Sequence, residues 1–247
     1  MARANATMQR LYIDADLTAD AALPLDLKQT HYLRNVLRLE AGASLLLFNG
    51  RDGEWRATLE QLNKKQAVAR LLEQTRPQDP QNDIWLLVAP VKKDRLDYLA
   101  QKATEMGVGR LQPVITQRTQ GSKGGIKHDK LVANSIEAAE QCNIMCLPEI
   151  AETQKLQTVL ADFPADRQII FCDEEADVST GGTALAALRG AKLALLIGPE
   201  GGFDDSERAL LLARDNVTRV SLGPRILRTD TAVVAALALV QSQIGDW

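Results

Sequence analysis

Cysteine is scarce in this 247-residue chain, and so are long apolar runs and aromatic side chains, which make up only 4% of the residues. Three cysteines cannot build a disulfide framework, so we expect a reducing compartment and a cytoplasmic protein. The longest apolar run, Ala232–Val240, has nine residues, whereas a membrane-spanning helix needs about 20. The first 16 residues contain no apolar stretch of signal-peptide length. These absences predict a protein with neither a membrane span nor a secretion leader.

Neither sign of charge dominates the chain, whose formal net charge is −3. Hydrophobic residues make up 45% and charged residues 25%, which is typical of a soluble globular protein and excludes a disordered or fibrous one. Residues 81–130 carry nine basic and five acidic side chains, whereas residues 131–247 carry nine basic and 17 acidic ones. The basic middle permits a polyanionic partner, although a solvated surface is the usual explanation.

The common signatures of nucleotide, metal and hydrolase sites are also absent. Neither G-x-G-x-x-G nor G-x-x-x-x-G-K-[ST] occurs, and the glycines of residues 121–125 have the wrong spacing for a phosphate loop. The chain has no H-E-x-x-H or G-x-S-x-G motif. Its two histidines and the spacing of Cys142, Cys146 and Cys172 do not suit a zinc site. We therefore expect no metal.

The first 75 residues predict a small, mostly β domain with one helix over Asp26–Arg38. The predicted strands are short and rich in Leu, Val, Ile or aromatics: Arg10–Asp14, Ser44–Phe48, Glu54–Glu60 and Ala67–Glu73. The polar segment Thr75–Asp83 contains two prolines and is predicted to be a linker.

Beyond residue 83 strands and helices alternate, which predicts an α/β domain with a mainly parallel sheet. The predicted strands are Ile84–Ala89, Leu111–Ile115, Ile169–Cys172, Leu193–Ile197 and Val217–Leu222. The predicted helices cover Asp94–Met106 and Asp129–Gln141, a short stretch after Gly181, one that begins at the capping box Asp204–Glu207, and the residues from Thr229 onward.

Two glycine-bearing segments follow predicted strands and lead into helices. They are Leu195–Phe203, which reads LLIGPEGGF, and Val220–Thr231, which reads VSLGPRILRTDT. Ligands of α/β proteins bind beyond the carboxyl ends of the strands, where glycine lets backbone amides approach closely. A single glycine is more often only a turn. Two such loops on neighbouring strands favour a cofactor site.

These two segments resemble the RsmE family, the 16S ribosomal RNA (uracil-N3)-methyltransferases, in GPEGGF and LGPRILRTDTA. Upstream matches run in order over nearly the whole chain, at His31–Arg38, Lys102–Val108, Glu137–Cys142 and Pro148–Ile150. The resemblance implies a SPOUT-class α/β fold, with a trefoil-knotted methyltransferase domain at residues 77–247. It also implies a PUA-like β-barrel that binds RNA at residues 1–76.

The resemblance further implies methylation of N3 of a uridine in 16S ribosomal RNA, with S-adenosylmethionine as the cofactor. Free RNA and the assembled small subunit both stay open as the substrate. Alternative functions are a SPOUT methyltransferase acting on another RNA, and an RNA-binding ribosome-assembly protein without turnover. A homodimer is expected, because SPOUT enzymes pair their knotted domains and because Thr231–Val240 is apolar nearly all round.

The resemblance implies a cofactor site and two catalytic candidates. The cofactor-binding residues are Ile197, Gly198, Pro199, Glu200, Gly201, Gly202, Leu222, Gly223, Ile226, Leu227 and Arg228. Arg228 is expected to stabilise the anion that forms when uracil N3 loses its proton. Glu200 is expected to accept that proton or to bind cofactor. An ion pair or a helix C-cap is the structural alternative for Arg228, and a helix cap is the alternative for Glu200.

Four basic residues are expected to contact RNA. Arg34 and Arg38 are four apart, which would place them on one helix face, and Arg118 and Lys123 flank or occupy the Gly-rich loop. A solvated helix face is the alternative for the first pair. After Glu-Gln-Cys the family commonly has an arginine within a few residues, whereas this chain has Asn143-Ile144-Met145-Cys146. A positive charge that could meet RNA is therefore missing there.

Overall fold

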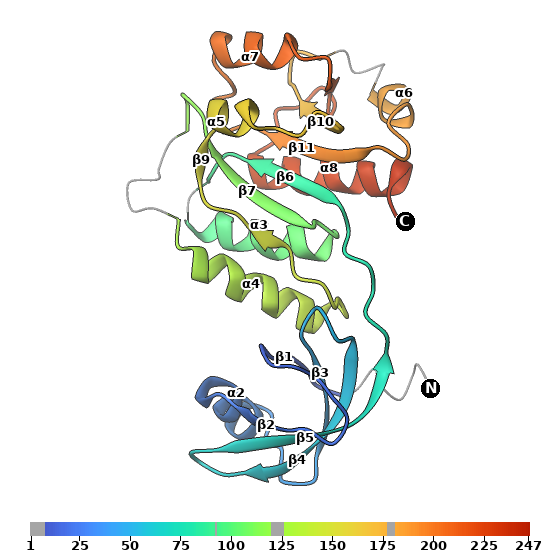
Figure 1. Cartoon of the computed structure of the whole chain (residues 1–247). Helices are drawn as coiled ribbons and strands as arrows, with labels where there is room; N and C mark the ends of the chain where they lie inside the picture. Colours follow the sequence, from blue (N-terminus) through green and yellow to red (C-terminus); the bar gives the residue numbers. More distant parts are fainter. Residues whose placement is uncertain (1–7, 92, 120–125, 177–180) are drawn as a thin grey trace. The chain divides into compact units, whose positions relative to one another are not determined.

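The computed structural model describes residues 8–91, 93–119, 126–176 and 181–247, which form two compact units (Figure 1). The N-terminal unit comprises the described residues up to Gln81 together with Ala139–Leu147. The C-terminal unit comprises Asn82–Ala138 and Pro148–Trp247. No helix in the described ranges is long and apolar enough to cross a membrane.

The N-terminal unit is built on a five-stranded sheet in the order β1-β3-β4-β5-β2. Its strands are β1 (Arg10–Tyr12), β2 (Ala22–Leu25), β3 (Ser44–Phe48), β4 (Glu54–Leu62) and β5 (Ala67–Arg76). Only β1 and β3 pair in parallel, and the other neighbours are antiparallel. The core lies between this sheet and the helical segment, with Leu33, Leu45 and Leu71 fully buried.

Two sequence-based expectations for this unit are corrected. The strand β5 continues through Arg76, so Thr75 and Arg76 belong to the sheet rather than to a linker. The sequence pattern did not indicate β2, because a strand interior disfavours proline and β2 contains Pro24. Since β2 lies at the edge of the sheet, the missing N–H of the proline costs no ladder hydrogen bond.

The predicted helix over Asp26–Arg38 is shorter and less regular than expected. Helix α2 (Leu27–His31) begins with a capping box from Asp26, continues as the π-helical segment η1 (Tyr32–Val36) and ends at Leu37. Arg34 is half-buried within η1, whereas Arg38 lies beyond the helix in a left-handed conformation with φ of 57°. The expectation that Arg34 and Arg38 share one helix face was therefore wrong, because the helix ends between them.

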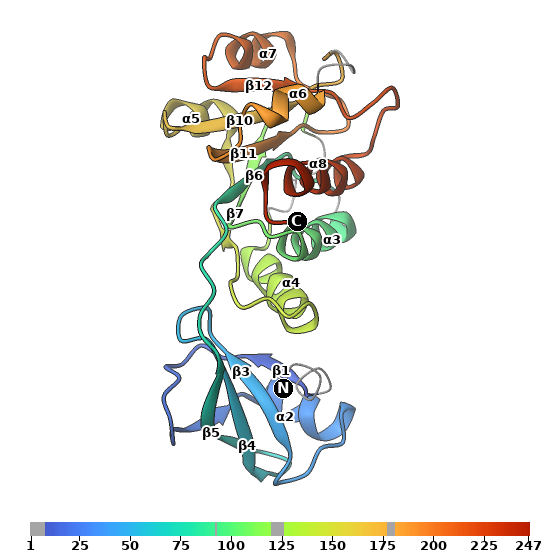
Figure 2. The same ribbon diagram turned by 90° about the vertical axis from the view of Figure 1, so that its right-hand side faces the viewer.

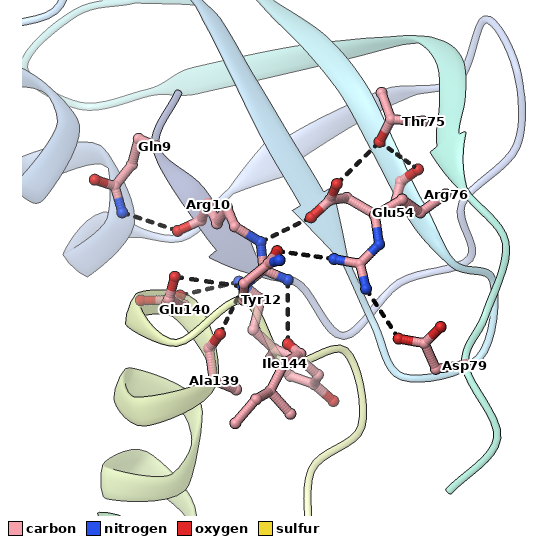
Figure 3. A network of polar contacts seen from close by, with 11 residues as sticks. Gln9, Arg10, Tyr12, Glu54, Thr75, Arg76, Asp79, Ala139, Glu140 and Ile144 are labelled. Atoms are coloured by element: carbon pink, nitrogen blue, oxygen red, sulfur yellow. Dashed lines mark hydrogen bonds and ion pairs between the residues drawn. The ribbon is translucent and has the colours of Figure 1, made fainter. Parts of the chain in front are cut away.

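A buried arginine holds the segment Ala139–Leu147 within the N-terminal unit (Figure 3). Arg10 Nε donates to the Glu54 carboxylate at 2.7 Å, and the two side chains are 8% and 2% exposed. The other guanidinium nitrogens donate to the carbonyl oxygens of Ala139 at 2.6 Å and Ile144 at 3.1 Å. One guanidinium thus neutralises a buried carboxylate and satisfies two backbone carbonyl oxygens, one in the last turn of a helix and one in the loop that follows it.

The residues that replace the family's arginine-bearing segment lie in this same region. Asn143 has a φ of 59°, and its side-chain oxygen accepts a hydrogen bond from Arg76 Nη1 at 2.8 Å. Gln78 Nε2 donates to Cys146 Sγ at 3.0 Å. The segment therefore accepts hydrogen bonds from Arg76 and Gln78, and Cys146 Sγ also donates to the carbonyl oxygen of Asp79 at 3.4 Å.

The C-terminal unit contains a parallel sheet in the order β12-β10-β11-β6-β7-β8, with β9 paired to the far end of β7. Its strands are β6 (Ile84–Val88), β7 (Arg110–Ile115), β8 (Glu149–Ile150), β9 (Gln154–Lys155), β10 (Arg167–Cys172), β11 (Lys192–Ile197) and β12 (Val217–Val220). The prediction of a mainly parallel α/β domain is confirmed.

Helices cover both faces of this sheet (Figures 1 and 2). They are α3 (Lys93–Glu105), α4 (His128–Gln141), α5 (Leu156–Ala161), α6 (Gly181–Ala186), α7 (Asp205–Leu212) and α8 (Thr229–Ile244). Along β11, Leu195 and Ile197 enter the core formed with α3 and α8, whereas Ala194 and Leu196 enter the core formed with α5 and α7. This period of two is what a strand buried on both faces requires.

Candidate functional site

A cavity of about 280 Å³ lies beyond the carboxyl ends of β10, β11 and β12 in the C-terminal unit. This is the end of a parallel sheet where α/β proteins bind ligands. The two glycine loops that follow β11 and β12 both line it. However, β11 and β12 are not neighbours, because β10 lies between them and supplies a third loop.

The first loop, Gly198–Phe203, leaves no room for a side chain at Gly198. A Cβ at Gly198 would lie 2.6 Å from the ring of Phe203, which itself packs edge-on against Phe171 with ring centroids 5.1 Å apart. Gly202 has a φ of 68°, a conformation that favours glycine. The loop therefore presents backbone to the cavity at a position fixed by an aromatic pair.

The second loop, Leu222–Arg228, is bonded to the first. Thr229 is buried, and its hydroxyl donates to the carbonyl oxygen of Gly198 at 3.0 Å. Gly223 has a φ of 103°, and the apolar side chain of Ile226 is 87% exposed at the cavity wall.

Most of the predicted cofactor residues are brought together around the cavity. Those that line it are Ile197, Gly198, Pro199, Glu200, Gly202, Leu222, Gly223, Ile226 and Leu227. Gly201 and Arg228 are not among the lining residues. Gly201 instead faces Arg118, whose Nη1 donates to the Gly201 carbonyl oxygen at 3.1 Å.

The two catalytic candidates have different surroundings. Glu200 is 58% exposed at its side chain and forms an ion pair with Arg95 of α3. Arg228 is exposed at the start of α8, and within the described ranges no hydrogen bond or ion pair engages its guanidinium. The carboxylate of Glu200 is therefore already occupied by a cation, whereas the guanidinium of Arg228 is available for a ligand.

The predicted RNA-contact residues belong to both units. Arg118 lines the cavity, whereas Arg34 and Arg38 belong to the N-terminal unit. Lys123 lies outside the described residues.

The third loop, Asp173–Ala176, follows β10 and was missed by the sequence analysis. Asp173 accepts hydrogen bonds from Arg208 Nη1 at 2.8 Å and Arg219 Nε at 2.7 Å, and its side chain is 2% exposed. Arg208 Nη2 also pairs with Glu175 at 3.0 Å, and Arg219 Nη2 donates to the Glu175 carbonyl oxygen at 2.8 Å. A run of carboxylates directly after an apolar strand was the signal that could have revealed this loop.

Burial controls the chemistry of the thiol that precedes this loop. Cys172 lines the cavity, and desolvation raises the pKa of its thiol to about 12, with the charge of Asp173 acting in the same direction. The thiol is therefore neutral at physiological pH and is not a nucleophile.

The predicted capping box of α7 is confirmed, and it also fixes the loop after β7. Asp204 accepts from the backbone N–H of Glu207 at 2.8 Å, and this bond lowers the pKa of Asp204. Glu207 is buried. One of its carboxylate oxygens accepts from the backbone N–H of Asp204, and the other accepts from the backbone N–H of Gln117 at 2.9 Å. Gln117 precedes Arg118, so the capping carboxylate helps to position an arginine at the cavity.

Among the described residues no group of three or more His, Cys, Asp or Glu side chains could hold a metal ion.

Comparison with known families gives two matches to this chain. The description "RNA methyltransferase domain" belongs to the family model that matches residues 77–241. The model described as "RNA methyltransferase PUA domain" matches residues 25–72. The N-terminal sheet and the C-terminal parallel sheet thus correspond to a PUA-like domain and an α/β methyltransferase domain.

Similar proteins agree with these matches. A protein of Rickettsia conorii named ribosomal RNA small subunit methyltransferase E is 31% identical over 234 residues, which cover 94% of each chain. A Neisseria gonorrhoeae protein of the same name was crystallised with S-adenosylmethionine. Its structure matches this one with a TM-score of 0.83 at 28% identity, and the match covers 97% of this chain and 99% of the Neisseria chain. The structure of a methyltransferase from Legionella pneumophila, also with bound cofactor, matches with a TM-score of 0.83 at 30% identity. That match covers 95% of this chain and 97% of the Legionella chain.

Proposed function

Because the chain belongs to the ribosomal RNA small subunit methyltransferase E family, whose RNA methyltransferase domain spans residues 77–241, we propose that it methylates N3 of a uridine in 16S ribosomal RNA. S-adenosylmethionine is the proposed methyl donor. The observation that carries the proposal is the cavity lined by the two glycine loops, Gly198–Phe203 and Leu222–Leu227, at the carboxyl ends of parallel strands.

The residues around the cavity fit this cofactor. Ile197, Leu222 and Leu227 offer apolar contact to a flat heterocycle, and the close approach of Phe203 to Gly198 keeps the first loop free of side-chain bulk. When bound, the cofactor supplies an electrophilic methyl group on a sulfonium. The role of the protein is then mainly to position the target nitrogen in line with that methyl group.

The free guanidinium of Arg228 suits the role of stabilising the uracil anion, because a cationic donor favours the deprotonated imide. The ion pair of Glu200 with Arg95 supports a positioning role for Glu200 within the first loop. We therefore rank Arg228 above Glu200 as the catalytic group.

Mapping modified nucleosides tests the proposed reaction. Purified protein is incubated with labelled S-adenosylmethionine and either 16S RNA or small subunits from cells that lack the enzyme, and the digested RNA is analysed by mass spectrometry. We expect 3-methyluridine. Methylation of another base or another RNA would support a different SPOUT specificity, and binding to RNA without methyl transfer would support an assembly protein.

The proposed RNA-binding surface of the N-terminal unit includes Arg34 and Arg38. The double variant Arg34→Gln/Arg38→Gln should bind RNA more weakly. The slope of log affinity against log salt concentration should become less negative by about 0.7–0.9 for each phosphate that is no longer neutralised. Filter binding at several salt concentrations measures this slope. The matched control Lys64→Gln/Lys65→Gln removes two exposed charges from the β4–β5 turn. A salt slope of Arg34→Gln/Arg38→Gln equal to that of the wild type would place Arg34 and Arg38 away from RNA.

The proposed assembly is a homodimer. One side of α8 is buried in the core through Val233 and Leu237, whereas Leu239 is 39% exposed and Ala235 is half-buried. An apolar strip of this kind supports burial by a second copy. Light scattering that finds an active monomer at assay concentrations would contradict the proposal.

The trefoil knot that the resemblance implies is part of the proposal too, and tracing the chain in an experimental density map tests it.

A further inference from the structure

The third loop carries three carboxylates in a row, and Glu174 is the one that neither Arg208 nor Arg219 pairs with. Its neighbours Asp173 and Glu175 are both engaged by Arg208, and Asp173 also by Arg219. Within the described ranges no hydrogen bond or ion pair engages the carboxylate of Glu174. The buried network therefore fixes the backbone on both sides of Glu174 while its own carboxylate stays available.

The carboxylate of Glu174 reaches the first glycine loop. It lines the cavity, and its Oε1 lies 3.2 Å from the position that a Cβ at Gly202 would occupy. Because β10 lies between β11 and β12, this loop emerges between the two glycine loops. A carboxylate acceptor without a partner among the described residues thus lies against the backbone of the first glycine loop, in a cavity whose lining also includes apolar side chains and the arginines Arg118, Arg208 and Arg225.

We propose that Glu174 binds the ribose of the cofactor, with its carboxylate accepting hydrogen bonds from the ribose hydroxyls; this inference rests on the proposed function. A carboxylate that accepts from ribose hydroxyls is a recurrent way for α/β proteins to hold a nucleoside. A carboxylate is acceptor-only, and two adjacent hydroxyls offer it two donors.

The other donors of S-adenosylmethionine suit this carboxylate less well. The ammonium group lies next to the cofactor's own carboxylate, which Glu174 would repel. The adenine amine is neutral and belongs to a flat ring for which the apolar residues Ile197, Leu222 and Leu227 provide the matching surface. The ribose hydroxyls are uncharged and paired, so they gain a charge-assisted hydrogen bond without that repulsion.

Calorimetry with three ligands tests the assignment. The ligands are S-adenosylhomocysteine, methylthioadenosine, which lacks the amino-acid part, and the 2′-deoxy form of methylthioadenosine. Glu174→Ala should lower the affinity for the first two ligands by the same factor, about 10- to 100-fold, because each ligand loses a hydrogen bond to a charged group. It should weaken the 2′-deoxy ligand much less. Glu174→Gln keeps one acceptor oxygen and should lose less affinity than Glu174→Ala.

Glu152→Ala is the matched control, since Glu152 is an exposed carboxylate of the same unit that does not line the cavity. A loss confined to S-adenosylhomocysteine would overturn the ribose assignment in favour of the ammonium group. Unchanged affinities in Glu174→Ala, with wild-type binding intact, would overturn it altogether. Failure of the wild-type protein to bind S-adenosylhomocysteine would instead overturn the proposed function, and this inference with it.

Discussion

Replacing Arg10 with methionine should lower the free energy of unfolding of the N-terminal unit by about 3–5 kcal/mol. The change leaves the Glu54 carboxylate, 2% exposed, without its cation. It also removes the donors to the carbonyl oxygens of Ala139 and Ile144. A buried charge without a partner is among the few defects that cost this much in a single substitution.

Hydrogen exchange measures this loss where it occurs. Amides of β3 and β5 should exchange faster in Arg10→Met by a factor that matches the lost free energy, as should those of Ala139–Leu147. The control Arg51→Met breaks an exposed ion pair with Asp16, worth about 0–1 kcal/mol, and should leave exchange nearly unchanged. Equal protection in both variants would show that the Arg10 network adds nothing to stability.

A double variant separates the two roles of Arg10. In Arg10→Met/Glu54→Leu the unpaired carboxylate is gone, so stability should recover in part. The carbonyl oxygens of Ala139 and Ile144 still lack donors, so amides of the 139–147 segment should stay less protected than in the wild type. Full recovery would assign the whole effect to the ion pair with Glu54.

The elements that the sequence predicted well are those whose signals are local. The strands β3, β6 and β11 are continuous apolar runs, and α8 begins at the predicted Thr229. The capping box Asp204–Glu207 involves residues three apart, so its geometry follows from the sequence alone.

The features that the sequence missed depend on distant contacts or on irregular backbone. Arg10 and Ala139 are 129 residues apart, so no local pattern could place Ala139–Leu147 in the N-terminal unit. The strands β8 and β9 have two residues each, too few to show a periodicity. The helix that should have carried Arg34 and Arg38 becomes π-helical and ends before Arg38.

The candidate site was predicted for the loops that carry recognisable motifs and missed for the one that does not. GPEGGF and LGPRILR both line the cavity. Strand order, however, is not written in the sequence, so the position of β10 between β11 and β12 could not be foreseen. Without that order, Asp173 and Glu174 had no visible connection to the glycine loops.

The second large effect is expected at Arg228. Arg228→Ala should slow single-turnover methylation by about 100-fold or more, the scale of removing one preorganised donor from a developing anion. Cofactor binding should change little, because Arg228 is not among the residues that line the cavity. Rapid-quench assays with saturating cofactor measure the first quantity, and calorimetry with S-adenosylhomocysteine measures the second.

Arg225→Ala is the matched control, since Arg225 is an exposed arginine of the same loop that lines the cavity. If Arg228 stabilises the anion, only Arg228→Ala should lose its rate at saturating RNA, whereas removing an arginine that only binds phosphate should mainly raise KM. Near-normal turnover in Arg228→Ala would make Arg228 a structural residue at the start of α8.

The pH dependence separates a catalytic Arg228 from a structural one. The reactive species is the uracil anion, whose fraction rises with pH, and a bound guanidinium lowers the pKa of the imide N–H. Without Arg228 the imide keeps a higher pKa, so the rate of Arg228→Ala should continue to rise with pH after that of the wild type has levelled off. Arg228→Lys keeps a positive charge and should therefore level off at a lower pH than Arg228→Ala. A merely structural defect would lower the rate by the same factor at every pH, and parallel pH profiles would exclude anion stabilisation by Arg228.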